Sequence, residues 1–263
     1  MVELKNRSLE RGIILMEVLA SSGACALADL HRQSGLPKST IRRLLGTLIS
    51  RNIVRRSVAD QKYRININLP ASIREAIPPE SALVADVAMP ILSTLTRQVG
   101  WPSDLHLIDG KKMRIVDSTR PLSPFQLYQS KINRKLNIFG SATGIACLAA
   151  MNDTEITKQD SATKGDKIWG LTRFLLSFQE FLKAVEATRT RGYGFRLATS
   201  LGETPLEDGL SAIAVPIQRN NQPVGAINLL FPRHYLGHEK FADQHLAALK
   251  NAATQITTNL KQF

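Results

Sequence analysis

The segment from Leu36 to Arg56 carries, on one face, the side chains best suited to contact a nucleic acid. Apolar residues recur there at the spacing of an α-helix, at Ile41, Leu44, Leu45 and Leu48. The opposite face is cationic or bears short polar groups, at Lys38, Ser39, Thr40, Arg42, Arg43, Gly46 and Ser50. Guanidinium and hydroxyl groups on such a helix can reach base edges in the major groove of DNA. A solvated surface helix is the competing interpretation, and the neighbouring segments decide between the two.

Two segments precede this helix in the order of a helix-turn-helix. Residues 9–20 are expected to form a first helix, with one face made by Leu9, Gly12, Ile13, Met16, Leu19 and Ala20. Residues 26–34 are expected to form a second helix, and Gly35 supplies the turn into the cationic one. This order favours DNA as the partner of the cationic face.

A basic hairpin is predicted directly after the cationic helix. Apolar residues alternate beyond Ser50, so that residues 53–56 and 62–67 are expected to form two short strands around a polar turn. The hairpin carries Arg55, Arg56, Lys62, Tyr63 and Arg64. Cations on such a wing contact phosphates and supply salt-dependent affinity rather than sequence choice. We therefore expect a winged helix-turn-helix domain over residues 1–70, with double-stranded DNA as its partner.

Composition and charge agree with a folded DNA-binding protein. The chain has 263 residues, 43% of them hydrophobic, and a net charge of +12. Residues 1–70 alone hold 12 basic and 5 acidic side chains, which concentrates the positive excess in the predicted DNA-binding domain. No segment has the ~20 apolar residues of a membrane span, and residues 1–12 lack the apolar core of a signal peptide, so a cytoplasmic location is expected. Cys25 and Cys147 have no CxxC partner and are expected to be buried free thiols.

A linker helix is predicted within residues 71–100. Pro70, Pro78 and Pro79 prevent one continuous helix across the start of this stretch. Residues 80–99 then show a helical apolar stripe, made by Leu83, Val84, Val87, Ile91, Leu95 and Val99. Pro90 is expected to kink or break this helix. A second copy of the helix is the preferred partner for the stripe, which predicts a homodimer, and packing against its own C-terminal domain is the alternative.

The remaining residues, 101–263, are expected to form an α+β domain with an antiparallel sheet. Residues 104–108 and 113–118 flank the hairpin signal Asp109-Gly110, and residues 210–217 and 224–231 are two further apolar strands. Helices are expected at residues 141–151, 177–191 and 239–260. Strands joined by hairpins and interleaved with helices are typical of this fold class.

These segments resemble the IclR family of bacterial transcriptional regulators. The resemblance rests on SGLPKSTIRRLLGTLISRNIVRR at 34–56, WPSD at 101–104, LNIFGSATGIACLA at 136–149, RGYGF at 191–195 and AIAVPI at 212–217. It implies a dimerising linker helix, a GAF-like C-terminal domain that binds a small acid, and assembly as a dimer or a dimer of dimers. The motifs GWPSD and IRRLLGTL look most like the MhpR type. That type implies an activator of a pathway degrading hydroxyphenylpropionate-like aromatic acids, with RNA polymerase as a further partner.

The resemblance also implies where the effector binds. The corresponding positions are Ser141, Ala142, Thr143 and Gly144, then Phe195, Arg196 and Leu197, and finally Ser211, Ala212 and Asn228. Family members that bind two- or three-carbon acids use an Asp, a Cys and two Ser residues in the last two regions, where this chain has Leu197 or Ala198, Ala212, Asn228 and Leu230. A roomier, more apolar pocket is expected, suited to a partly aromatic carboxylate. Helix N–H groups near Ala142 and Thr143 could hold the carboxylate. Asn228 is equally well interpreted as a satisfied core residue.

Two other functions compete with this one, a repressor that senses a different acid and an enzyme. A repressor of the same family that senses a small aliphatic acid, such as glyoxylate or pyruvate, is the first alternative. An enzyme is disfavoured because the chain has no G-x-S-x-G, P-loop, G-x-G-x-x-G or H-E-x-x-H motif. No cofactor, metal site or catalytic residue is therefore expected.

Overall fold

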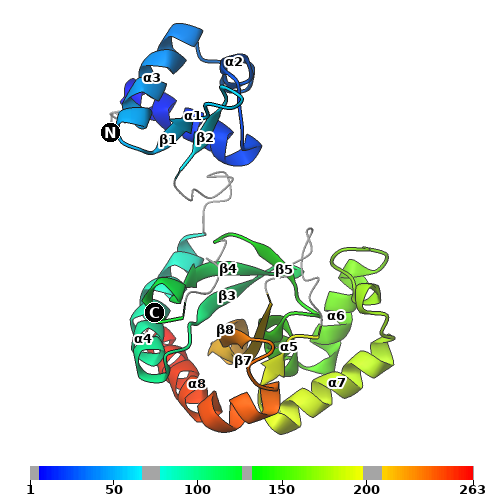
Figure 1. Cartoon of the computed structure of the whole chain (residues 1–263). Coiled ribbons are helices and arrows are strands. Elements are labelled where there is room, and N and C mark those ends of the chain that lie inside the picture. Colours follow the sequence, from blue (N-terminus) through cyan, green and yellow to red (C-terminus); the bar gives the residue numbers. More distant parts are fainter. Residues whose placement is uncertain (1–5, 67–77, 126–131, 198–208, 263) are drawn as a thin grey trace. The chain divides into compact units, whose positions relative to one another are not determined.

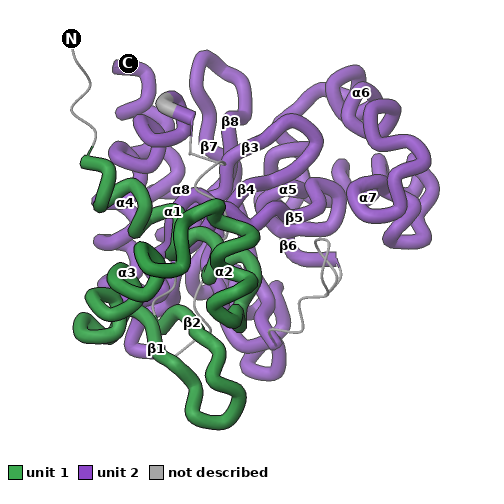
Figure 2. The backbone as a smooth tube through the Cα atoms, turned by 90° about the horizontal axis from the view of Figure 1, so that it is seen from above, with its two compact units in different colours: residues 1–76 green, residues 77–263 purple. Residues whose placement is uncertain are grey.

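A computed structural model describes residues 6–66, 78–125, 132–197 and 209–262. The chain divides into two compact units, residues 1–76 and residues 77–263 (Figure 2). The predicted domain boundary at residue 70 lies outside the described residues. Each unit is described by itself below.

Unit 1 contains three helices followed by a two-stranded hairpin (Figure 1). The helices are α1 (Arg7–Ser22), α2 (Leu27–Ser34) and α3 (Lys38–Ser50), and the strands are β1 (Val54–Arg56) and β2 (Tyr63–Ile65). Asn6 caps α1, since its side chain accepts the N–H groups of Ser8 and Leu9 at 3.1 Å. Gly35 ends α2 with φ of 69°, in the left-handed region that favours glycine. The predicted helix-turn-helix order and wing are therefore confirmed.

The core of unit 1 lies between the helices and the base of the wing. Its buried apolar members are Leu15, Leu19, Cys25, Leu30, Leu36, Ile41, Leu45 and Val54. Leu9, which the periodicity placed on the apolar face of the first helix, is instead 62% exposed. Leu15 takes the inward position on α1, one turn before Leu19.

Unit 2 is built on a six-stranded sheet in the order β5-β4-β3-β8-β7-β6, with each neighbouring pair antiparallel. The strands are β3 (Asp104–Asp109), β4 (Lys112–Ser118), β5 (Lys135–Asn137), β6 (Gly194–Phe195), β7 (Leu210–Arg219) and β8 (Gln222–Pro232). The helices are α4 (Pro79–Val99), α5 (Ala142–Ala149), α6 (Asp153–Thr163), α7 (Phe178–Arg191) and α8 (His238–Leu260), with short 3₁₀ turns at Arg120–Leu122 and Leu171–Phe174. The predicted α+β class with an antiparallel sheet is confirmed.

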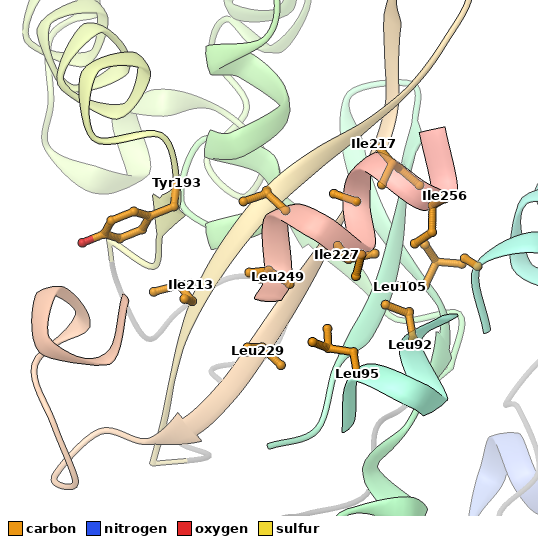
Figure 3. Close-up of a cluster of buried hydrophobic side chains, with 14 of the residues drawn as sticks. Leu92, Leu95, Leu105, Tyr193, Ile213, Ile217, Ile227, Leu229, Leu249 and Ile256 are labelled. Atoms are coloured by element: carbon orange, nitrogen blue, oxygen red, sulfur yellow. The ribbon is translucent and has the colours of Figure 1, made fainter. Parts of the chain in front are cut away.

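The two faces of this sheet bury different apolar clusters. The α4 and α8 side packs large aliphatic residues, including Leu92, Leu95, Leu105, Ile213, Ile227, Leu229, Leu249 and Ile256 (Figure 3). The α5 side instead presents small residues from the central strands, Ala212, Ala214 and Ala226. Helix α5 lies close to this face of the sheet, which leaves little room for large side chains. At Gly194 of β6, for example, an added Cβ would lie only 2.3 Å from the backbone oxygen of Ala142 in α5.

Helix α4 runs unbroken through Pro90, so of the kink or break predicted at this residue the break is wrong. Proline removes the hydrogen bond to the carbonyl of Asp86, and both residues are exposed to water on the outer side of the helix. The inner side is held by Ala88 and Leu92, which are fully buried against the α8 side of unit 2. Burial on one side therefore outweighs one lost hydrogen bond on the other.

Part of the apolar stripe of α4 is buried within its own unit. Val84 and Leu95 are 5% and 3% exposed and pack in the cluster shared with α8. Leu83, Val87 and Ile91, spaced four residues apart on one face, are only half-buried. The alternative interpretation of the stripe thus accounts for Val84 and Leu95. It accounts in part for Val87, Ile91 and Val99, which pack against the same cluster while partly exposed.

The two cysteines and the apolar character of the helices were also predicted from the sequence. Cys25 and Cys147 are both buried free thiols, as expected. Burial raises the pKa of the Cys147 thiol well above its ordinary value, which keeps it protonated and unreactive. Within the described part of the chain, no helix combines the length and the apolar character needed to cross a membrane.

Candidate DNA-binding face and effector site

The cationic face of α3 is open to solvent in unit 1. Lys38, Ser39, Arg42 and Arg43 are exposed and Thr40 is half-buried. Consecutive helical residues point 100° apart, so Arg42 and Arg43 occupy different flanks of the helix. Arg43 lines a groove of about 500 Å³ shared with α1 residues such as Ser8 and Leu9, whereas Arg42 lies outside it. Arg42 is therefore the arginine on the face that α1 does not border.

Two of the predicted wing cations are held within the wing itself. Arg64 donates to both carboxylate oxygens of Asp60, at 2.9 and 2.6 Å. Hydrogen bonds from Arg64 and from the Lys62 backbone N–H hold the pKa of the Asp60 carboxyl well below its usual range. Arg56 lies 5.6 Å from the centre of the Tyr63 ring and donates to the Gln61 carbonyl. These contacts shape the hairpin.

Arg55 and Lys62 are the wing cations most available to an outside partner. Both are exposed, and neither side chain has a hydrogen-bond or ion-pair partner among the described residues. Tyr63, also predicted to contact DNA, is half-buried and exchanges backbone hydrogen bonds with Cys25 at 2.8 and 3.0 Å. Cys25 lies just before α2 in the chain, so these hydrogen bonds connect the wing to the start of that helix.

In unit 2, the start of α5 presents buried N–H donors. Ser141 caps the helix by accepting the Gly144 N–H at 3.1 Å. The backbone N–H groups of Ala142 and Thr143 have no acceptor among the described residues, although these residues are 4% and 1% exposed. Unpaired N–H groups and the helix dipole together favour an anionic oxygen at this position.

Beneath the start of α5 lies a cluster of buried polar side chains from β3. The imidazole Nδ1 of His106 is 2.7 Å from the Thr143 hydroxyl, and its Nε2 is 3.8 Å from Oδ2 of Asp104. Asp104 also accepts from both Nε and Nη2 of Arg120, at 3.2 and 2.8 Å, and from the Ser118 hydroxyl at 2.6 Å. Asp104, His106 and Arg120 are not among the site residues predicted from the sequence.

A signal for this cluster is present in the sequence. Asp104 and His106 are two residues apart in a predicted strand, so their side chains point to the same face of the sheet. Two ionisable side chains on the buried face of a strand are uncommon unless they are paired. The strand alone does not identify Arg120 as the partner, because that residue follows the next strand.

The electrostatics of the cluster keep Asp104 charged. Burial by itself would raise the pKa of the Asp104 carboxyl, but His106 and the Arg120 guanidinium lower it by more. The pKa therefore lies well below its ordinary value. The Arg120 side chain is only 10% exposed, so the opposite charges form a buried and nearly neutral pair.

Asn228 joins this cluster from β8. Its Oδ1 accepts the Asp104 backbone N–H at 2.7 Å, and the residue is 3% exposed. Ala214 lies opposite Asn228, and Ala212 lies opposite Leu230, in the β7–β8 register. The structure thus brings six predicted effector residues to the α5 side of the sheet, namely Ser141, Ala142, Thr143, Gly144, Ala212 and Asn228.

The other predicted effector residues line a separate pocket at the sheet edge. Phe195, Arg196, Leu197 and Ser211 contribute to a pocket of about 520 Å³ that Arg233 and His238 also line. Ser211 and Ala212 are neighbours in β7, so they point to opposite faces of the sheet and cannot both face α5. Leu197 remains close to the α5 region, because its N–H donates to the Gly140 carbonyl at 3.1 Å.

Comparison with known proteins connects both units to one family. Residues 8–57 match the IclR helix-turn-helix domain, and residues 80–258 match the bacterial transcriptional regulator IclR C-terminal domain. The Escherichia coli transcriptional repressor IclR is 27% identical over 256 residues, covering 95% of this chain and 89% of that protein.

Solved structures share the fold. A transcriptional regulator from Rhodococcus sp. RHA1 is 23% identical with a TM-score of 0.64, covering 98% of this chain and 99% of that one. An IclR homologue from Microbacterium hydrocarbonoxydans, crystallised with 4-hydroxybenzoate, is 18% identical with a TM-score of 0.55, covering 97% of this chain and all of that one. The matched families and relatives are regulators of transcription and not enzymes. The chain therefore belongs to the IclR family of bacterial DNA-binding transcriptional regulators.

Proposed function

We propose that this regulator activates an operon for the degradation of an aromatic acid of the hydroxyphenylpropionate type, and that the acid itself is the effector. The observation that carries the proposal is the pair of N–H groups of Ala142 and Thr143 at the buried start of α5, which have no acceptor among the described residues. A carboxylate would supply the acceptor that these donors lack.

The lining on the α5 side supports an aromatic acid over an aliphatic one. Ala212 and Leu230 lie side by side in the β7–β8 register, and both are buried on the α5 side of the sheet. The family members that bind two- or three-carbon acids have polar side chains in these regions. The relative crystallised with 4-hydroxybenzoate, an aromatic carboxylate, has the same fold.

Calorimetric titration of the full chain tests the effector. Benzoate, 3-(3-hydroxyphenyl)propionate, glyoxylate and pyruvate would be titrated separately, with Ala142→Trp as the variant whose indole fills the start of α5. We expect an aromatic acid to bind the wild type and to lose affinity in the variant. Binding of glyoxylate or pyruvate alone would instead support the repressor that senses an aliphatic acid, and binding of none would contradict an acid effector.

We further propose that the chain acts on DNA as a homodimer, through the half-buried face of α4. Leu83 lies on that face outside the apolar cluster of unit 2, and Val87 and Ile91, which pack against that cluster, keep part of their surface exposed beside it. Two copies would present two α3 helices to half-sites one DNA turn apart, ~34 Å, or a multiple of it.

Sedimentation equilibrium on the double variant Leu83→Glu, Val87→Glu tests the dimer. Carboxylates on the apolar face would be desolvated by association, so monomers with weak operator binding are expected. Val84→Ala is the matched control, because its side chain packs inside unit 2 and its removal should leave the assembly state unchanged. A dimer that persists in the double variant would place the main interface elsewhere.

A further inference from the structure

The clearest unexplained polar atom on the α5 side of the sheet is Nε2 of His106. The residue is 4% exposed, and Nε2 has no hydrogen-bond partner among the described residues. Leaving a buried polar group unpaired destabilises the folded state, so such an atom calls for an explanation. The other ring nitrogen, Nδ1, is already occupied by the Thr143 hydroxyl at 2.7 Å.

The neighbour of this atom is the Asp104 carboxylate, at a distance that fits one bridging oxygen. Nε2 and Oδ2 of Asp104 are 3.8 Å apart, too far for a direct hydrogen bond. An oxygen placed beside both atoms could lie within hydrogen-bond distance of each. Because the carboxylate only accepts, the bridging group must donate to it. In the tautomer in which the Thr143 hydroxyl donates to Nδ1, the ring hydrogen is on Nε2. A hydroxyl then meets both requirements, since it accepts from Nε2–H and donates to the carboxylate.

A second carboxylate would not fit this position. It could not donate to Asp104, and its charge would be repelled by the Asp104 carboxylate that Arg120 keeps ionised. A methyl group or hydrogen would leave Nε2 unpaired. The positions of Nε2 and of the Asp104 carboxylate therefore favour a hydroxyl over a carboxylate, a methyl group or hydrogen.

We propose that His106 and Asp104 read a hydroxyl group of the effector, and that they thereby select hydroxylated carboxylic acids over the same acids without the hydroxyl. The inference rests on the proposed effector site, in which the N–H groups at the start of α5 hold the carboxylate. His106 joins the two parts of that site, because its Nδ1 is hydrogen-bonded to Thr143 in the first turn of α5.

The test compares benzoate with 2-, 3- and 4-hydroxybenzoate by calorimetry on the full chain. These probes differ by a single hydroxyl, and the three positions allow for different distances between the carboxylate and His106. The wild type is expected to bind one hydroxybenzoate about 10- to 150-fold more tightly than benzoate, which is the effect of a hydrogen bond to a charged group.

His106→Leu removes the proposed contact, and the preference for the hydroxyl should fall to about one. His106→Gln keeps a side-chain N–H donor, so it should retain part of the preference. His245→Leu is the matched control, because His245 packs against Phe241 in α8, on the other face of the sheet. That variant should keep the full preference. The fluorescence of Trp101 and Trp169, which both lie in unit 2, checks that all three variants fold.

The outcomes separate this inference from the proposed function. A wild type that binds benzoate as tightly as every hydroxybenzoate would overturn the inference and leave the carboxylate site standing. An unchanged preference in His106→Leu would do the same. A wild type that binds none of the four probes would overturn the inference and contradict the aromatic effector as well.

Discussion

Replacing Arg120 by Met is expected to lower the free energy of unfolding of unit 2 by roughly 3–5 kcal/mol at pH 7. The variant leaves Asp104 buried and charged without its bidentate partner, which held both carboxylate oxygens at 3.2 and 2.8 Å. The methionine side chain can replace the apolar stem of arginine but not its charge. Trp101 and Trp169, the two tryptophans of the chain, both lie in unit 2, so urea unfolding followed by tryptophan fluorescence reports on this unit.

The loss should shrink at low pH, and the sign follows from the pKa of Asp104. That pKa is lowered in the folded state, so the carboxylate contributes stability above the pKa of the unfolded chain, about 3.9. The contribution is lost progressively as pH falls from that value through the lower pKa of the folded state. The difference between wild type and variant is therefore largest near neutral pH and narrows below pH ~4.

A second substitution isolates the charge. Asp104→Asn combined with Arg120→Met removes both charges, so the double variant should be more stable than Arg120→Met alone. A single variant as stable as the wild type would show that the pair does not stabilise the folded unit. If the double variant is less stable than Arg120→Met alone, the loss of stability comes from altered packing and not from the unpaired carboxylate.

Replacing Arg42 by Ala is expected to weaken operator binding by about 1–3 kcal/mol, roughly 5- to 150-fold, and to relax the choice of base at one position. Arg42 is exposed on α3, on the flank that α1 does not border. A guanidinium there can donate two hydrogen bonds to a guanine. Fluorescence anisotropy with operator and single-base variants measures both effects.

Lys62→Ala on the wing is the matched comparison. Its side chain has no partner among the described residues and is expected to contact a phosphate. The variant should bind all sequences more weakly, and its slope of log affinity against log salt should be about one unit flatter. If both variants bind the operator with wild-type affinity and salt dependence, α3 and the wing are not the DNA-binding surface.

The order of the elements follows from the sequence because local patterns determine it. The helical stripe of α3 and the continuous apolar runs of β7 and β8 can be recognised without knowledge of distant residues. Short elements were missed for the same reason. Strand β6 has two residues and β5 has three, and each forms only by pairing with a longer strand.

The proposed effector site was harder to predict because it depends on tertiary contacts. The resemblance points to the start of α5, where the N–H groups of Ala142 and Thr143 have no acceptor among the described residues. It could not show that Asp104 and His106 lie beneath this helix, since the His106–Thr143 contact joins residues 37 positions apart. It also grouped Ser211 with Ala212, although alternation in β7 separates them. The burial of Val84 and Leu95 against α8 likewise required the packed structure.

The central claim is that binding of an acid in unit 2 changes transcription at a site bound by unit 1. In vitro transcription from an operator template tests it most directly, with purified RNA polymerase, the full chain and increasing amounts of the acid chosen by calorimetry. A ligand that distinguishes the active from the inactive state by ~1–3 kcal/mol shifts their ratio about 5- to 150-fold. We expect the transcript level to rise with the acid when the wild type is present and to stay constant with Arg42→Ala. A transcript level that stays constant while calorimetry shows the acid bound would contradict it.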